Sequence, residues 1–179
     1  IEQNPSLLTL DGLTALTSIG GQLRITDNES LESLSGLDGV KYIDNINISG
    51  NGNLSSLAAL SALNSLSNNL NISQNHSLTS LSGLGSLTEV GQLLQIYDNN
   101  ALTSLEGLEG LVSVGGDLDI QHNPVLPSIE PLHGITAVGG HVRFVSNGSL
   151  CTTAVDAFID LLHAAGFEGA TSISANAGC

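Results

Sequence analysis

The sequence lacks tryptophan and methionine, and aromatic residues make up only 3% of its 179 positions. A core assembled around large aromatic side chains is therefore excluded. Hydrophobic residues still account for 41% of the chain, which is ample for the core of one domain. They are mainly Leu, Ile, Val and Ala, so the core is built from small and similar units. Such a composition is typical of a repeat protein.

Positive charge is equally scarce. Arg24, Lys41 and Arg143 are the only basic residues, against 17 acidic ones, which gives a formal net charge of −14. This charge repels phosphate backbones and anionic membrane surfaces. We therefore expect no nucleic-acid partner.

Long apolar runs are absent as well. No run approaches the roughly 20 residues needed to cross a bilayer, so we expect no transmembrane segment. No signal peptide is present either, and a secreted precursor would already have lost one.

An asparagine recurs at intervals of 23 or 24 residues along most of the chain. Leucines follow each asparagine at three-residue spacings, and each repeat closes on two apolar residues separated by one position. This periodicity indicates a stack of repeated structural units. The asparagines are Asn4, Asn28, Asn51, Asn75, Asn99, Asn123 and Asn147, and the first leucines after them are Leu7, Leu31, Leu54, Leu78, Leu102, Leu126 and Leu150.

The alternating pair predicts a short strand with one face inward, and the three-residue spacing predicts an inward apolar side chain at each bend. One repeat is therefore one coil, and stacked coils form a parallel sheet. We predict a β-solenoid, a right-handed parallel β-helix of the leucine-rich-repeat kind, with about six 24-residue coils over residues 1–150. Residues 151–179 are expected to form a helical cap.

Two types of polar or small residue have expected roles in the turns. The recurring asparagine is predicted to point inward and to bond backbone groups of its own and neighbouring coils. The Gly-Gly pairs at 20–21, 115–116 and 139–140 are predicted to supply left-handed backbone angles before the strand. Small residues are expected where the coil is tightest, at Gly12, Gly36, Ala59, Gly83 and Gly107.

The repeat ends after Asn147, where the pattern becomes that of an amphipathic helix. Thr153 and Asp156 resemble a capping box, and Gly166 is a typical helix stop. A last segment, 172–176, repeats the pattern of a strand followed by an asparagine and is expected to cover the final coil. The apolar face of the helix comprises Val155, Phe158, Ile159 and Leu162.

Only two cysteines are present, Cys151 and Cys179, and they bracket this cap. We predict a disulfide between them, with free or metal-bound thiols as the alternative. A disulfide persists in oxidising compartments, so we expect a secreted or cell-surface protein. No metal or other cofactor is expected.

The amino end differs from the carboxyl end. Ile1 precedes Asn4 by three residues, as Ile25 precedes Asn28, so the chain starts within a strand. We expect this end to lack a cap and to expose a strand edge. Self-association there, or a preceding domain, is the expected consequence.

Residues 1–147 contain units of the form N-x-S-L-x-S-L-x-G-L-x-x-L-x-x-V-G-G-x-L-x-I-x-x-N. These units resemble the receptor L domain family, whose solenoids bind ligands in receptor ectodomains and recur in fungal cell-wall and bacterial surface proteins. The resemblance implies a leucine-rich solenoid outside the cell. It also implies binding or adhesion rather than catalysis.

The outward positions of the strands form amide-rich rows, which suit contact with an extracellular protein or carbohydrate through many hydrogen bonds. The alternative is a solvated sheet whose amide ladders only stabilise stacking. Asp119 and Arg143 are expected to form a cross-strand ion pair. The candidate ligand-binding residues are Arg24, Asn47, Asn71, Gln95, Tyr97, Asp119 and Arg143.

Ice binding, a polysaccharide-active enzyme and a metal site are the alternatives to this binding function. A column of hydroxyls suggests ice binding, although it lacks paired threonine rows; it comprises Thr9, Ser33, Ser56, Ser80, Ser104 and Ser128. A polysaccharide-active enzyme needs clustered acids inside a groove, and the acids here are scattered, so we expect no enzyme. The spacing of His122, His141, Asp117 and Asp119 matches no known metal site.

Several sequons follow from the repeat. Asn28, Asn75 and Asn147 are expected to point inward and to be unavailable for glycosylation. In a eukaryotic host the predicted glycan acceptors are Asn47, Asn53 and Asn71.

Overall fold

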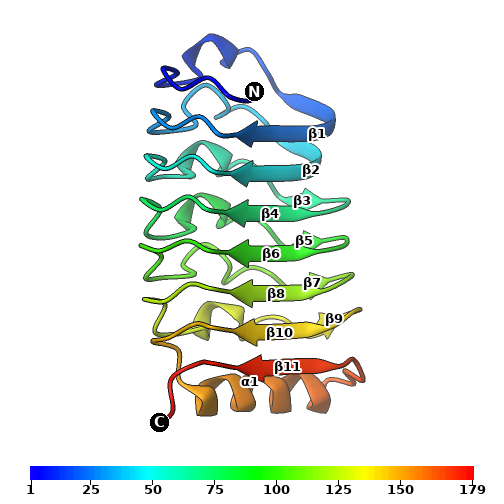
Figure 1. The fold of residues 1–179 in the computed structure, drawn as a ribbon. Helices are drawn as coiled ribbons and strands as arrows, with labels where there is room; N and C mark the ends of the chain where they lie inside the picture. The colour runs from blue at the N-terminus through cyan, green and yellow to red at the C-terminus, as the bar shows by residue number, and fades with distance from the viewer.

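The computed structural model describes all 179 residues and shows a parallel β-solenoid closed at its carboxyl end by one α-helix (Figure 1). Every coil contributes a strand to one long face, and all strand pairs are parallel. The long-face strands are β1 (Ser18–Thr26), β2 (Tyr42–Ser49), β4 (Leu70–Ser73), β6 (Leu94–Tyr97), β8 (Leu118–Gln121), β10 (Val142–Val145) and β11 (Thr171–Ser174).

The strands β4, β6, β8 and β10 are each preceded by a two-residue strand around a corner. These short strands pair with one another and make a second, narrower side of the solenoid. They are β3 (Ser65–Leu66), β5 (Glu89–Val90), β7 (Ser113–Val114) and β9 (Ala137–Val138). Four coils also carry a short 3₁₀ helix: η1 (Asp11–Leu13), η2 (Ala58–Leu60), η3 (Ser82–Leu84) and η4 (Glu130–Leu132).

The register confirms the predicted repeat. Ile72 lies beside Ile96, and Ile96 lies beside Ile120, so equivalent inward positions of adjacent coils stack directly. All three side chains are completely buried. The apolar columns merge into one core of 44 buried residues that runs along the whole stack.

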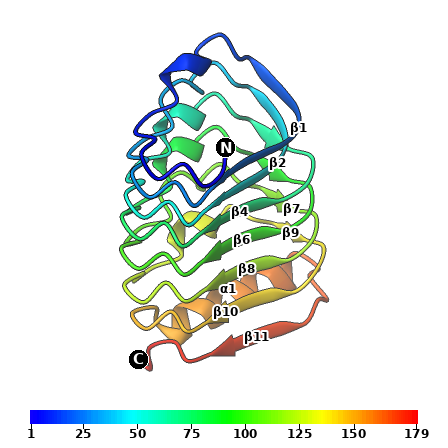
Figure 2. The same ribbon diagram turned by 45° about the horizontal axis from the view of Figure 1, so that its top comes forward.

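The first coil is packed less fully than the others. Leu7, Leu13, Leu16 and Ile19 are only partly buried, because no coil covers their outer side. About five coils are therefore packed on both sides, one fewer than the predicted six. Figure 2 shows this open first coil at the end of the stack opposite α1.

The recurring asparagine points inward, as predicted. The backbone N–H of Asn99 donates to Oδ1 of Asn123 at 3.1 Å, and its Nδ2 donates to the carbonyls of Ile72 and Tyr97. The same pattern joins every coil and ends on Asn176 behind β11. The sequon asparagines Asn28, Asn75 and Asn147 are completely buried within this ladder.

A residue with left-handed backbone angles precedes each ladder asparagine, which the sequence analysis did not predict. This conformation turns the chain inward after the strand, so that the next side chain enters the core. Only one of these residues is a glycine, although the conformation is unfavourable for other residue types. They are Gln3, Asp27, Gly50, Gln74, Asp98, His122, Ser146 and Ala175, with φ between 54° and 67°.

The expected role of the Gly-Gly pairs was wrong for most of them. Among the pairs only Gly21 has a left-handed angle, with φ of 130°. Gly115 and Gly139 are required by close packing instead, because a Cβ on Gly115 would lie 2.1 Å from the carbonyl oxygen of Gly91. The tight positions at Gly36, Gly83 and Gly107 are confirmed, since a Cβ there would lie about 2 Å from a leucine carbonyl oxygen. The prediction was wrong for Gly12 in the open first coil, where a Cβ meets nothing within 4 Å.

Helix α1 (Thr152–Ala164) covers the last coil and buries the predicted apolar face. The predicted capping box was wrong: Cys151 is the N-cap residue and no side chain caps the helix. A bridge between Cys151 and Ala177 fixes the chain at this point, and Thr152 donates to the Ala177 carbonyl through both its N–H and its hydroxyl. Gly166, with φ of 97°, follows the end of the helix as expected.

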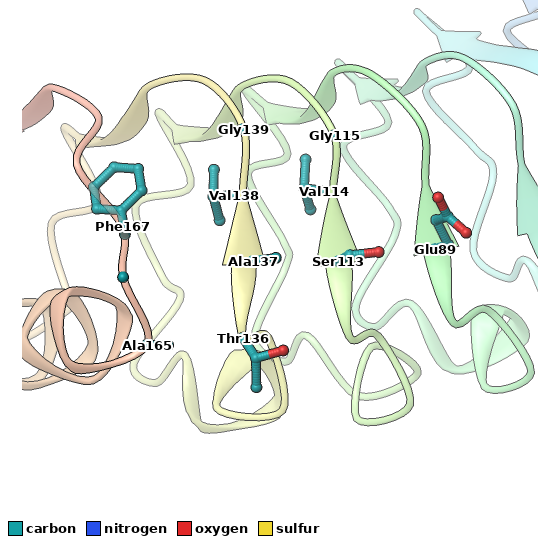
Figure 3. Close-up of a pocket in the computed structure, with 11 residues that line it drawn as sticks. Glu89, Ser113, Val114, Gly115, Thr136, Ala137, Val138, Gly139, Ala165 and Phe167 are labelled. Atoms are coloured by element: carbon teal, nitrogen blue, oxygen red, sulfur yellow. The ribbon is translucent and has the colours of Figure 1, made fainter.

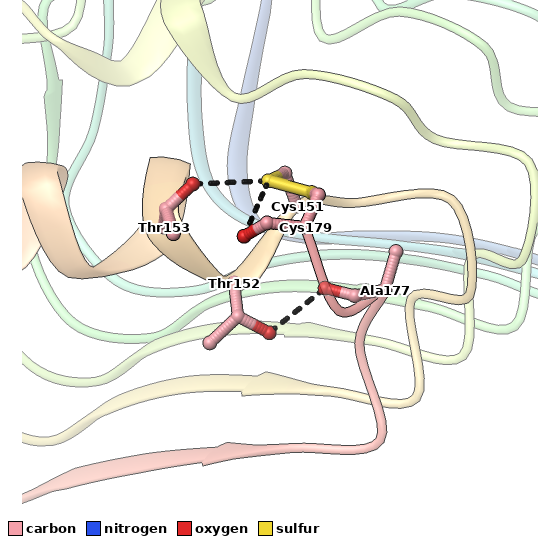
Figure 4. The surroundings of a disulfide bond; sticks show 5 residues. All are labelled: Cys151, Thr152, Thr153, Ala177 and Cys179. Atoms are coloured by element: carbon pink, nitrogen blue, oxygen red, sulfur yellow. Dashed lines mark hydrogen bonds between the residues drawn. A yellow bond between two sulfur atoms is a disulfide. The ribbon is translucent and has the colours of Figure 1, made fainter.

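The predicted disulfide joins Cys151 to Cys179, with their Cα atoms 5.7 Å apart (Figure 4). It ties the last residue of the chain to the start of α1. Between these two points lies β11, which pairs with β10. At 13 residues, α1 falls short of the length that a membrane crossing requires.

Candidate functional site on the strand face

Six of the seven predicted binding residues form a single row across the long face. Each is the register partner of the next, in the order Arg24, Asn47, Asn71, Gln95, Asp119 and Arg143. Because the strands are parallel and in register, the side chains stand side by side along the solenoid axis. Tyr97, the seventh, lies two residues after Gln95 in an adjacent outward row.

We define the strand face as this row and the two outward rows that flank it. One flanking row comprises Gln22, Asn45, Asn69, Leu93, Asp117 and His141, and the other comprises Thr26, Ser49, Ser73, Tyr97, Gln121 and Val145. Within these rows Arg24 and Arg143 balance Asp117 and Asp119. Glu2, the register partner of Thr26, adds one carboxylate at the open end and pairs with Arg24 at 3.0 Å. The strand face is therefore close to neutral, and almost all of the net charge of −14 belongs to the other surfaces.

The central row contains two short hydrogen-bonded groups rather than one continuous amide ladder. Nδ2 of Asn71 donates to Oδ1 of Asn47 at 3.0 Å. Nε2 of Gln95 donates the other way along the axis, to Oδ2 of Asp119 at 3.2 Å. Oδ1 of Asn71 lies between the groups, buried and without a hydrogen-bond partner. The row thus breaks between β4 and β6.

Asp119 is the centre of the second group. It is only 5% exposed, and its two oxygens accept hydrogen bonds from the side-chain amides of Gln95 and Gln121. The predicted ion pair with Arg143 is long, at 4.0 Å. Arg143 instead donates from Nη1 to Oδ2 of Asp117 at 2.8 Å.

Asp117 is held in its charged form. The backbone N–H of His141 donates to its Oδ1 at 2.8 Å, and Arg143 donates to its other oxygen. These two hydrogen bonds, that of His141 first, lower the pKa of Asp117 below its ordinary value. The carboxylate is therefore a fixed acceptor rather than a proton donor at neutral pH.

Tyr97 is the only aromatic residue on the strand face. Its ring meets that of His122 edge to face, with centroids 5.1 Å apart and an interplanar angle of 78°. His122 occupies the left-handed turn directly after β8, so the solenoid backbone sets its position. The other tyrosine, Tyr42, is 65% exposed and lies at the start of β2, outside the strand face.

The two histidines and two aspartates weighed as metal ligands do not converge. No group of three or more His, Cys, Asp or Glu side chains in the structure is placed to hold a metal ion. His122 packs on Tyr97, and Asp117 and Asp119 are occupied by hydrogen bonds from Arg143 and the two glutamines.

The hydroxyl column engages in local hydrogen bonds. The Oγ atoms of Ser56, Ser104 and Ser128 accept from the backbone N–H two residues further on, at 3.0 to 3.1 Å. Thr9 and Ser80 bond to side chains two residues further on. The column therefore stabilises the turns between coils.

The predicted glycan acceptors differ in their surroundings. Asn53 is exposed. Asn47 and Asn71 are half-buried and bonded to each other on the strand face, so a glycan on the Nδ2 atom of Asn71 would have to be placed beside this hydrogen bond.

A shallow groove of about 330 Å³ lies on the narrow side, between the short strands and the segment after α1 (Figure 3). Glu89, Ser113 and Ala137 line its floor, and Phe167 lies at one end. The repeat pattern did not predict this groove. The signals that could have revealed it are the glycines at 115 and 139, which leave the corner without side chains. Glu89 is the only ionisable residue among its lining residues.

The open first coil presents an apolar surface. Ile1, Leu7, Leu10 and Leu13 line a groove of about 340 Å³ there. The expected self-association or preceding domain at this end remains a prediction.

Comparison with known proteins identifies no relative: no protein-family model, no curated protein and no solved structure matches the chain.

Proposed function

We propose that the chain is a non-catalytic extracellular module for binding, adhesion or cell-surface architecture, and that it contacts a protein or carbohydrate through the strand face. The observation that carries this proposal is the neutrality of that face in a strongly acidic molecule. Two of the three basic residues of the chain, Arg24 and Arg143, stand on it. We further propose membership of the receptor L domain family, on the repeat units described above.

Charge explains why this face suits a partner better than the others. A ligand that approaches the remaining surfaces meets the repulsion or attraction of a net charge of −14, whereas the strand face exerts little field of its own. Its amide, hydroxyl and carboxylate groups still offer many donors and acceptors. A flat neutral surface of this kind supports contacts through distributed hydrogen bonds.

The break in the central row argues against a purely structural role for these amides. A continuous ladder would pair every amide with its neighbours, as the buried asparagine ladder does. Here Gln95 bonds Asp119, while the Oδ1 atom of Asn71 is left unpaired. An unpaired buried oxygen costs about 1–3 kcal/mol, which stacking alone does not explain.

The acids support binding rather than catalysis. A general acid needs a raised pKa, whereas the pKa of Asp117 is lowered by its hydrogen bonds. Both aspartates of the strand face are fixed by donors. The groove on the narrow side contains a single carboxylate, that of Glu89, and hydrolysis of a glycosidic bond ordinarily uses two.

Ice binding is the second candidate, and the hydroxyl column is the feature that favours it. Those hydroxyls are engaged in turns, which leaves fewer of them to order water. A thermal-hysteresis measurement separates the two proposals, because activity at micromolar protein concentration would favour ice binding.

Extracellular placement is supported by the disulfide between Cys151 and Cys179, which closes the cap. Such bonds persist in oxidising compartments.

The strand face can be tested by shielding it. The chain contains no free cysteine, so a single introduced cysteine can be labelled selectively with a polyethylene-glycol maleimide. Ser49→Cys places the polymer on the strand face, and Ser113→Cys places it on β7 as the matched control. Each protein is then applied to arrays of glycans and extracellular proteins.

We expect the unlabelled chain to bind members of the array and the polymer at position 49 to abolish that binding. The polymer at position 113 should leave it unchanged. Absence of binding by the unlabelled chain, or equal loss with both labels, would contradict the proposal.

A further inference from the structure

We infer that the strand face contains a subsite for a neutral glycan, centred on Tyr97 between β6 and β8. This inference rests on the proposed function and specifies its ligand. The subsite combines one aromatic ring with two oriented amides, those of Gln95 and Gln121. Aromatic surface beside a few placed polar groups is the usual composition of a site for a small organic ligand.

The ring of Tyr97 is an isolated apolar platform on an otherwise polar surface. The register partners of Tyr97 on the neighbouring strands are Gln121 and Ser73, and Ser73 is buried. His122 meets the ring edge to face, so the orientation of the ring is restrained before any ligand arrives. A restrained ring loses less conformational freedom on binding.

Asp119 determines what the two glutamines present. An ionised carboxylate can only accept hydrogen bonds, so both amides turn an N–H toward it. The carbonyl oxygen and the second N–H of each amide remain for other partners. Because Asp119 is almost fully buried, its role is to position Gln95 and Gln121 rather than to contact a ligand.

The hydrogen bond between Gln95 and Asp119 leaves the Oδ1 atom of Asn71 without a partner. Asn71 and Gln95 are register partners, and an amide donated from Gln95 would satisfy the Asn71 oxygen. Gln95 is bonded to Asp119 instead, at the strand beside Tyr97. The structure therefore gives up a stacking hydrogen bond at the place where the aromatic ring stands.

These groups match the chemistry of a pyranose ring. One side of a pyranose carries C–H groups, which pack on an aromatic face, and its equatorial hydroxyls both donate and accept, as the two amides do. A strand face without excess positive charge, in a molecule of net charge −14, favours an uncharged glycan over an acidic one. A neutral polysaccharide also offers repeated units to a surface that itself repeats.

The test measures retention of the complete chain on immobilised neutral polysaccharides, namely mannan, xylan, galactan and β-1,3-glucan. Tyr97→Ala removes the platform, and Tyr97→Phe keeps the ring. Tyr42→Ala removes an equally large exposed ring away from the strand face and is the matched control. Asp119→Asn keeps the shape of the positioning residue but allows it to donate.

We expect the chain to bind at least one of these polysaccharides. Tyr97→Ala should weaken that binding by about tenfold, while Tyr97→Phe and Tyr42→Ala should bind as the parent does. Asp119→Asn should also weaken binding, with an unfolding transition close to that of the parent. Thermal unfolding of each variant shows whether it is folded.

Retention that is unaffected by Tyr97→Ala would overturn the inference, as would the absence of retention on all four polysaccharides. If the polymer at position 49 blocks an extracellular protein while no polysaccharide is retained, the strand face stands as a binding surface and the glycan subsite does not. If the polymer at position 49 blocks nothing, the proposed function itself fails.

Discussion

The side-chain oxygen of Asn75 accepts two hydrogen bonds from Asn51 in the preceding coil, one from its backbone N–H at 3.3 Å and one from its Nδ2 at 3.2 Å. Asn75 in turn donates to the carbonyls of Ile48 and Ser73. One buried side chain therefore satisfies four backbone or side-chain groups from two coils.

Asn75→Ala is expected to destabilise the fold strongly. It leaves the two donors of Asn51 without their acceptor and removes a donor from the buried carbonyls of Ile48 and Ser73. Each buried group left unpaired costs about 1–3 kcal/mol. We expect the free energy of unfolding to fall by about 3 kcal/mol or more, measured by urea denaturation. Asn53→Ala, at an exposed asparagine in the turn after Asn51, is the control and should change it by less than about 0.5 kcal/mol. Similar losses in the two variants would show that the ladder contributes little.

Gly115, between two coils, and Gly20, beside the open first coil, are expected to respond oppositely to alanine. A Cβ at Gly115 would lie 2.1 Å from the Gly91 carbonyl oxygen, whereas a Cβ at Gly20 meets nothing within 4 Å. Gly115→Ala should lower the melting temperature, because forcing atoms into a packed site costs about 1–3 kcal/mol. Gly20→Ala should be neutral or slightly stabilising, because it reduces the freedom of the unfolded chain. Equal tolerance at both positions would rule out backbone contact between coils at this corner.

Removal of the disulfide is expected to loosen the carboxyl end of the solenoid first. The bond spans 28 residues, and a loop of that length corresponds to about 3–4 kcal/mol in the chain-entropy model. The double variant Cys151→Ala/Cys179→Ala leaves no free thiol. Hydrogen exchange should speed up in β10 and β11 but remain slow in β4 and β6, because stacked repeats couple mainly to their neighbours. Uniform acceleration along the stack would contradict this expectation.

Asp117 is expected to make the fold less stable in acid. Its pKa is lowered in the folded chain, by the His141 N–H first and then by Arg143, so the folded state binds its proton less readily than the unfolded state does. The stabilisation is present above the unfolded pKa of about 3.9. It is lost as the pH falls through the lower folded pKa.

Asp117→Asn should therefore be less stable than the parent at pH 7, and the difference should shrink as the pH falls below about 4. Chemical denaturation at several pH values measures it. Asp160→Asn, on the exposed side of α1, makes the same change of charge and is the control. A difference that is constant over the pH range would exclude the ionised Asp117 as its source.

The sequence was sufficient to predict the coils because the same physical requirement recurs in each. Every coil must satisfy buried backbone groups behind its strand, so an asparagine such as Asn99 recurs, and it must fill a fixed volume, so a leucine such as Leu102 follows. The strand-face row follows from the same register. These features depend on spacing alone. The disulfide was predictable for another reason, since the only two cysteines lie on either side of the cap.

The details that the sequence did not reveal depend on the path of the backbone. Gln74, Asp98, His122 and Ser146 share no side-chain chemistry, yet all adopt the left-handed turn, because the coil and not the residue imposes it. Gly115 and Gly139 occupy equivalent positions in adjacent coils. Glycine is required at both because the coils lie too close for a Cβ atom, not because of the backbone angles.

The sequence also did not predict which side chains of the strand face pair with one another. The register places Arg143 opposite Asp119, but the guanidinium reaches diagonally to Asp117, whose carboxylate is already oriented by the His141 N–H. Asp119 is then free to orient the two glutamines. Side-chain reach across a sheet is not fixed by the spacing of the repeat.

The near-uniform coil length has a consequence for inheritance. Residues 75 and 99 occupy equivalent places, and each ladder asparagine bonds its neighbour in the same way. Loss or duplication of a 24-residue segment in the gene would therefore rejoin compatible surfaces and leave both ends of the molecule unchanged. Recombination can therefore lengthen or shorten the strand face by whole coils, and no other change in the sequence is needed.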